Sequence, residues 1–225
     1  MAISIPNLAM IPSGYKAGKL YSVLPTDGVG DFTVSRPTAD ALNTGNATRV
    51  NSAGLIETVG ENVPRLDYSD GGCPVLLTEP QSKNDILWSE DFTQSWTRPA
   101  NTVVTPNTSI SPDGTLNAST VTGLDGSGAN DLYTQPTFDT ANKTVTYSVY
   151  LKGSGTLRIN ISNNSDDNDS KIITLSSNWE RYSITYTFNS TPSVQMVCNL
   201  DDLGATATTY ESWGAQFEEK SYPTS

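Results

Sequence analysis

Two stretches in the second half of the chain alternate between apolar and other residues, with a period of two. The stretches are residues 144–152 (TVTYSVYLK) and residues 182–188 (YSITYTF). Their inward positions are Val145, Tyr147, Val149 and Leu151 in the first and Tyr182, Ile184, Tyr186 and Phe188 in the second. Because successive side chains of a strand point to opposite faces, this period predicts two half-buried β-strands.

Further strands are expected on either side of these two. They are placed at residues 86–92, 102–105, 117–122, 156–162, 171–175, 194–200 and 208–217. Glycine-rich and proline-containing turns separate them, such as Pro112-Asp113-Gly114 and Gly153-Ser154-Gly155. About eight or nine strands without any helical period predict an all-β, antiparallel sandwich over residues 84–225.

The first third of the chain has a different pattern. Residues 1–19 contain two prolines and two glycines without a useful period, which predicts an extended arm. From residue 20 to residue 77, short apolar runs alternate with turn signals, and only residues 37–43 offer a helical turn. These strands are too few and too short for a core of their own, so residues 1–83 are interpreted as an arm and anchoring β region that needs a partner surface.

Charge and composition exclude several classes of function. The chain has 13 basic and 24 acidic residues among 225, a net charge of −11, which opposes binding to nucleic acid. Histidine is absent, so the most common general base and transition-metal ligand is missing. No apolar run approaches the length of a membrane span, and the N-terminus lacks the features of a secretory signal, so we expect a soluble chain without membrane insertion.

The two cysteines, Cys73 and Cys198, are 125 residues apart and belong to different expected units. They form either a clip between the units or two free, partly buried thiols that pack as small hydrophobic residues. We favour the free thiols.

Saccharide recognition requires flat aromatic rings on an accessible surface, beside groups that hydrogen-bond hydroxyls. Trp96, Tyr133 and Tyr150 are the candidates, because they lie just after a strand, after a glycine-rich loop and on the outward side of 144–152. Half-buried packing is the alternative for all three. We expect the other tryptophans, Trp88, Trp179 and Trp213, to belong to the core.

Acidic residues suggest two kinds of chemistry. The loop containing Asp166 and Asp169 concentrates oxygen atoms that suit calcium, although an Asx-rich turn explains the same composition. Adjacent acids, such as Asp201 and Asp202, point to opposite faces of a strand and cannot flank one glycosidic bond. We therefore expect no catalytic residues and no enzyme activity.

Longer phrases of the sequence resemble a known class of protein. They are CPVLLTEPQSKNDILWSEDFTQSW (73–96), WGAQFEEKSYPTS (213–225) and, in the front half, SGYKAGKLYSVLPTDGVGDFTVSRPTADAL and NATRVNSAGLIETVGENVPRLDY. The chain is similar over nearly its whole length to bacteriophage virion proteins, in which an N-terminal attachment region leads into a jelly-roll domain similar to carbohydrate-binding modules.

This resemblance implies a fold and a set of partners. The sandwich is expected to be a jelly roll, and the protein to be a fibre or decoration component of a virion, made in the bacterial host cytoplasm. Its N-terminal region would dock on capsid or tail proteins and form a homo-oligomer, with a trimer favoured. Two other functions stay open: an adhesin for a cell-surface glycan and a polysaccharide depolymerase.

The resemblance also implies a metal position. Jelly rolls of this type often hold a structural calcium where the first and last strands meet. In this chain that place corresponds to Glu90 or Asp91 near Gln216 or Glu218. No other cofactor is expected.

Overall fold

The structure is a computed structural model that describes residues 14–21, 31–36, 47–98, 101–127, 132–136, 141–163, 167–189 and 197–224. These residues contain seventeen strands and no helix, and hence no helix able to cross a membrane. The chain divides into two compact units, residues 1–80 with residue 225, and residues 81–224. Each unit is described by itself.

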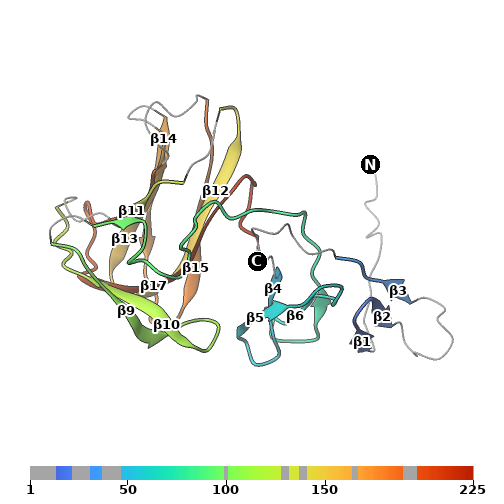
Figure 1. The fold of residues 1–225 in the computed structure, drawn as a ribbon. Coiled ribbons are helices and arrows are strands. Elements are labelled where there is room, and N and C mark those ends of the chain that lie inside the picture. Colours follow the sequence, from blue (N-terminus) through green and yellow to red (C-terminus); the bar gives the residue numbers. More distant parts are fainter. Residues whose placement is uncertain are drawn as a thin grey trace, which may run out of the picture. The chain divides into compact units, whose positions relative to one another are not determined.

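Unit 1 consists of three small antiparallel sheets, with the strand orders β1-β2-β3, β4-β5 and β6-β7 (Figure 1). The strands are β1 (Gly14–Lys16), β2 (Lys19–Tyr21), β3 (Phe32–Thr33), β4 (Ala47–Val50), β5 (Ile56–Val59), β6 (Leu66–Asp67) and β7 (Val75–Leu76). Gly18, with φ +77°, makes the tight turn between β1 and β2. Residues 14–19, expected to be extended, therefore form a hairpin. The rest of the expected arm and the helical turn at 37–43 lie outside the described residues.

In unit 1, hydrogen bonds from arginine side chains stabilise strands that have only a small hydrophobic core. Arg65 donates through Nε and Nη2 to the carbonyl oxygen of Thr48, at 2.9 and 2.7 Å. Arg36 donates through Nη2 to the carbonyl oxygen of Val59 at 2.5 Å. In the described part of this unit, the buried apolar side chains are Leu20, Val59, Pro64 and Leu66. Guanidinium groups that join backbone carbonyls thus connect strands that bury little apolar surface.

Unit 2 is a sandwich of two five-stranded antiparallel sheets, visible as two layers in Figure 1. The first sheet has the order β15-β12-β17-β10-β9 and the second the order β14-β13-β16-β11-β8. Their bounds are β8 (Trp96–Thr97), β9 (Val103–Ile110), β10 (Leu116–Thr122), β11 (Leu132–Thr134), β12 (Thr144–Gly153), β13 (Thr156–Ser162), β14 (Asn168–Thr174), β15 (Glu180–Thr187), β16 (Val197–Asp201) and β17 (Thr209–Glu218).

The pairing of these strands is that of a jelly roll. Strand β10 pairs with β17, β11 with β16, β12 with β15 and β13 with β14. The pairs are nested, so together they form one long hairpin. Because successive pairs belong alternately to the two sheets, the hairpin is rolled around a common core. The expected all-β jelly roll is confirmed.

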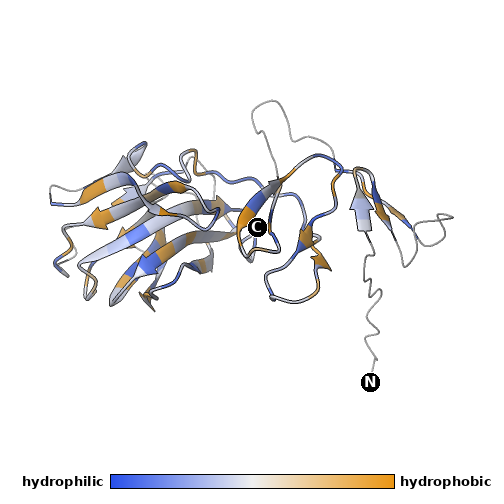
Figure 2. Cartoon of the chain, turned by 90° about the horizontal axis from the view of Figure 1, so that it is seen from below, coloured by the Kyte–Doolittle hydropathy of each residue, from blue (hydrophilic) through white to orange (hydrophobic). Residues whose placement is uncertain are grey.

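The core lies between the two sheets and follows the predicted alternation. In β12 the side chains of Val145, Tyr147, Val149 and Leu151 are fully buried, and in β13 those of Leu157, Ile159 and Ile161. Ile184 and Phe188 are buried as predicted, while Tyr182 and Tyr186 pack against the core from its margin. Figure 2 shows the resulting mixture of hydrophobic and hydrophilic residues along the strands.

Residues 86–92, predicted to be a strand, instead form an irregular strap. The side chain of Asn84 bonds the backbone of β17, the N–H of Asp85 donates to the carbonyl of Phe217, and the N–H of Ala215 donates to the carbonyl of Ser89. The strap therefore continues the line of β10 along the second half of β17. It is anchored by Ile86 and Phe92, whose buried side chains belong to the core.

Two short strands, β8 and β11, were not predicted, because two or three residues are too few to show a period. The predicted strand ended at residue 105, before Pro106, but β9 continues to Ile110. The proline is tolerated because β9 is at the edge of its sheet. Asn107, with φ +56°, lies where the pairing with β10 shifts register.

Candidate functional site

The outer face of the second sheet is polar and accessible. The registers of the paired strands align Thr97, Tyr133, Asn199, Asn160 and Ser170 in one continuous row of backbone positions across the five strands. The intervening residues Leu132, Leu157, Ile159 and Leu200 are buried. We call the outward side chains of Thr97, Tyr133, Arg158, Asn160, Ser170 and Ile172 the open face. Five strands at their usual spacing span about 19 Å, which suits an extended ligand.

Charge on the open face is balanced. Arg158 of β13 and Asp201 of β16 are opposite in register and form an ion pair through Nη2 and Oδ2. The other Asp201 oxygen, Oδ1, accepts the N–H of Leu203 at 2.7 Å. The pair is thus fixed by the backbone, next to the row that contains Tyr133.

Tyr133 is half-buried at the centre of strand β11. Leu132 and Thr134 on either side of it are buried, so the tyrosine ring lies on the open face. Its side chain makes no hydrogen bond or ring contact within the described part of the chain. Trp96 and Tyr150, the other two aromatic candidates, both have ring contacts with described residues.

Trp96 is 5% exposed and belongs to the core. Its ring centroid lies 4.6 Å from that of Phe92, and its Nε1 donates to the carbonyl oxygen of Trp88 at 3.1 Å. The expectation that Trp96 offers a ring face to a saccharide is wrong, because the alternating position in β8 turns the indole inward.

The three tryptophans assigned to the core have different environments. Trp213 is 7% exposed, but it is not part of the core between the sheets, because it is opposite Tyr150 on the outer side of the first sheet. Trp88 is 47% exposed, and Trp179 is half-buried with Nε1 bonded to the carbonyl of Ile110 at 2.8 Å. The core prediction is therefore wrong for all three. Trp88 and Trp179 do not lie within a regular strand, where period two would fix their direction, and Trp213 lies on the outward side of β17 next to the register shift.

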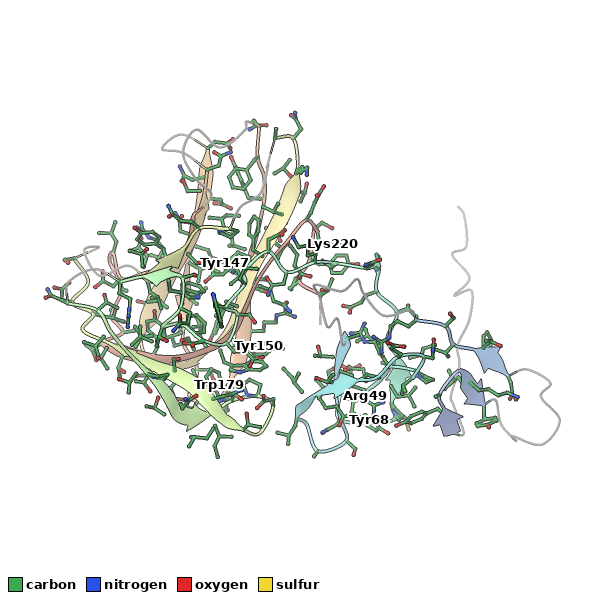
Figure 3. The ribbon with its side chains drawn as sticks, viewed as in Figure 1. Arg49, Tyr68, Tyr147, Tyr150, Trp179 and Lys220 are labelled. Carbon is green, nitrogen blue, oxygen red and sulfur yellow. The ribbon has the colours of Figure 1, made fainter. Side chains whose placement is uncertain are left out.

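Tyr150 lies on the opposite side of the molecule from the open face, on the outer surface of the first sheet. Figure 3 labels it with Tyr147, which is three residues earlier in β12 and points into the core. The Tyr150 ring lies 5.6 Å from that of Trp213, and the Arg181 guanidinium lies 5.5 Å from its centroid. Arg181 also donates from Nη2 to Oγ of Ser148 at 3.0 Å and to Oε1 of Gln216. We call these five residues the Tyr150 cluster.

A glycine makes room for this cluster. Gly214 has φ +63° at the point where the pairing of β12 with β17 shifts register. A Cβ there would lie 3.3 Å from Cδ2 of Tyr150. Any larger residue would strain the backbone and press on the ring. Tyr150 is thus packed by neighbours on several sides.

The acidic candidates for metal binding mostly have local hydrogen bonds. Asp91 accepts from the N–H and hydroxyl of Thr93, and Oδ1 of Asp169 accepts from the N–H of Ser170. Asp166 lies outside the described residues. Within the part that is described, no three Asp, Glu, Cys or His side chains are grouped to hold a metal ion.

Glu90 has a distinct environment. Asn117 Nδ2 lies 3.4 Å from Oε2 of Glu90 and 3.2 Å from Oδ2 of Asp113. Burial, followed by the charge of Asp113, raises the pKa of Glu90 above its usual range. Burial acts to raise the pKa of Asp113, but hydrogen bonds from Ser111, Thr115 and Asn117 outweigh it and lower the pKa. Glu90 is therefore the less favourably ionised member of the pair.

Cys73 is a free thiol, as favoured from the sequence. It is exposed rather than partly buried, because it follows two exposed glycines outside any sheet. The side chain of Cys198 is outside the described set.

Sequence reasoning identified Tyr133 but missed the polar residues around it. The alternation of residues 156–162 could have identified Arg158 and Asn160 as outward residues, because the buried positions are 157, 159 and 161. Their partnership with Asp201 and Ser170 depends on register between distant strands, which one sequence does not show.

No protein-family model matches the sequence, and no curated protein matches it. Among solved structures, the chain is similar to the CBM22-1 xylan-binding domain of Paenibacillus barcinonensis Xyn10C, with 16% identity, a TM-score of 0.44, and coverage of 63% of this chain and 95% of that one. It is also similar to the CBM22-1–GH10 modules of Clostridium thermocellum xylanase 10B, with 15% identity, a TM-score of 0.45, and coverage of 61% and 28%.

A third similar structure is the enzymatically active domain of tailspike protein 4 from bacteriophage CBA120. The identity is 10%, the TM-score 0.47, and the coverage 60% of this chain and 21% of that one. This chain thus spans less than a third of the xylanase and tailspike structures. The likeness to all three concerns the fold alone.

Proposed function

We propose that unit 2 binds a saccharide chain across the open face, with Tyr133 as the stacking ring. The observation that carries the proposal is the row of Thr97, Tyr133, Asn160 and Ser170 across the sheet. An accessible ring beside amide and hydroxyl groups supplies both a stacking surface and hydrogen-bond partners for sugar hydroxyls. The saccharide would lie across the strands, next to the pair Arg158–Asp201.

Binding, rather than hydrolysis, is the activity that we propose. Several carboxylates that the sequence offered for catalysis have structural partners. Asp201 pairs with Arg158, and Oδ2 of Asp202 accepts the N–H groups of Asp125 and Gly126 at 2.9 and 3.0 Å. Glu218 is buried and accepts the N–H of Thr224 at 3.0 Å.

We further propose that the protein is a component of a bacteriophage particle, docked through unit 1 to other virion proteins. The sequence resemblance supports this role. The few buried apolar residues of unit 1 also support it, because such a unit gains stability from burial against other chains. Tyr15 and Phe32, exposed by 43% and 40%, supply apolar surface for such contacts.

Glycan-array binding of the full chain tests the saccharide proposal. Tyr133→Ala should weaken binding to any glycan that the wild type retains by about tenfold or more, since it removes the stacking ring. Tyr222→Ala is the matched control, because Tyr222 is an exposed tyrosine of the same unit outside the strands. Unchanged binding in Tyr133→Ala, with both variants folded, would refute the assignment to the open face.

A further inference from the structure

Arg181 carries a positive charge that no carboxylate of the described residues balances by an ion pair. Arg49, Arg65 and Arg158, in contrast, pair with Glu57, Glu79 and Asp201. The acceptors of Arg181 are neutral, the hydroxyl of Ser148 and the amide oxygen of Gln216. A guanidinium group stays protonated at any ordinary pH, so the Tyr150 cluster has a net positive charge.

The same cluster has more hydrogen-bond donors than acceptors. Nε of Arg181 and Nε1 of Trp213 are both buried without an acceptor among the described residues. Nη2 of Arg181 donates to Ser148 and Gln216, whereas Nη1, which is not buried, has no partner among the described residues. Trp213 itself is more than nine-tenths buried, in contact with Tyr150. The composition of this cluster therefore favours a ligand that brings acceptors and negative charge.

The guanidinium is also held in place before any ligand arrives. It lies over the Tyr150 ring, and Ser148 and Gln216 fix its Nη2 edge. Nη1 is the part of the group left to donate to an anionic oxygen, and a fixed group loses less entropy on binding. An anionic oxygen, such as one of a carboxylate, is thus the acceptor that this geometry favours.

The net charge of −11 does not prevent such binding. At physiological ionic strength, exposed charges separated by more than about 8 Å are largely screened from one another. Lys152 forms an ion pair with Glu211 at 2.8 Å on the same sheet face, so this carboxylate is already compensated. At short range, the positive charge of Arg181 therefore outweighs the net negative charge of the chain.

We propose that the Tyr150 cluster is a second binding site in unit 2, specific for a sugar carboxylate, and separate from the open face. Arg181 would hold the carboxylate through Nη1, and Tyr150 would contact the sugar ring. The site lies on the other sheet from Tyr133, so the two sites would act independently.

An NMR titration of the full chain with sodium glucuronate, with glucose as the neutral counterpart, tests this proposal. Ionic strength is held constant with sodium chloride, and the indole N–H signal of Trp213, assigned with Trp213→Phe, reports binding. We expect a saturable shift with glucuronate and none with glucose. Arg181→Gln should abolish the shift, and Arg181→Lys should weaken binding by about tenfold.

Two controls test where the ligand binds and which part of it is recognised. Tyr133→Ala alters only the open face, so it should leave the titration unchanged. Sodium acetate distinguishes a site for any carboxylate from one for a sugar carboxylate. An equal response to glucose or to acetate, a response that persists in folded Arg181→Gln, or no saturable shift in the wild type would each overturn the proposal.

Discussion

The side-chain amide of Asn84 bonds the backbone of β17 as a neighbouring peptide group would, with its Oδ1 accepting the N–H of Phe217 at 2.9 Å. Its Nδ2 donates to the carbonyl oxygen of Ala215 at 3.0 Å. The same Oδ1 accepts the N–H of Ile86 at 3.0 Å and so turns the chain into the strap. One side chain thus provides hydrogen-bond partners for backbone groups of β17 beyond the end of its pairing with β10.

Asn84→Ala should lower the free energy of unfolding of unit 2 by about 1–3 kcal/mol, because it leaves backbone groups of β17 without partners. Chemical denaturation measures the loss. Asn178→Ala, at an exposed turn whose side chain has no hydrogen bond among the described residues, should change it by less than about 0.5 kcal/mol. Equal effects would show that the amide does not act as a strand partner.

A fragment of residues 81–225 should fold cooperatively, because it contains both sheets and the strap. A fragment of residues 93–225 should lose that cooperativity, since it lacks the buried Ile86 and Phe92 and leaves an edge of β17 open. Thermal melts followed by circular dichroism distinguish the two. Failure of the longer fragment to melt cooperatively, when the full chain does, would contradict the assignment of the strap to unit 2.

Ile184→Asp should unfold unit 2, because an unpaired carboxylate in the core costs several kcal/mol against a total stability of about 5–15 kcal/mol. Ile184 is 5% exposed, whereas Thr185, its neighbour, points outward and bonds the hydroxyl of Thr146. Thr185→Asp should cost about 1 kcal/mol. Similar melting temperatures for both variants would mean that the register of β15 is wrong.

Glu90→Gln should make unit 2 more stable than the wild type at pH 7. Since burial and Asp113 raise the pKa of Glu90, the folded protein favours the protonated carboxyl, and this contribution is present at low pH and lost as pH rises. The advantage of glutamine should therefore shrink as pH falls through the ordinary range of a carboxyl group. Denaturation at several pH values measures it. Glu219→Gln, which removes an exposed carboxylate paired with Lys143, should give no stabilisation.

Homo-oligomerisation through unit 1, as a trimer, is the remaining prediction. The charge of the trimer would total about −33, so we expect the acidic sandwich domains to repel one another while unit 1 makes the contacts. Mass measurement should give a trimer for the full chain and a monomer for residues 81–225. A monomer in both cases would refute this prediction.

Strict alternation made the long strands predictable, as β12 and β15 illustrate, because burial of one face leaves a signal in a single sequence. The strap was not distinguishable from a strand, since Ile86 and Phe92 are as apolar as strand residues and only the bonds of Asn84 to β17 define its course. For the same reason Tyr133 was recognisable as a candidate, but its row with Asn160 depends on pairings among β11, β16 and β13.

The arginine-based construction of unit 1 has a consequence for its response to temperature. The heat capacity of unfolding arises mainly from newly hydrated apolar surface, and polar groups contribute with the opposite sign. A unit in which Arg36 and Arg65 join carbonyl groups around few buried apolar side chains should therefore have a small heat-capacity change for its size. Its stability curve should be flatter than that of the sandwich, so that cooling weakens it less.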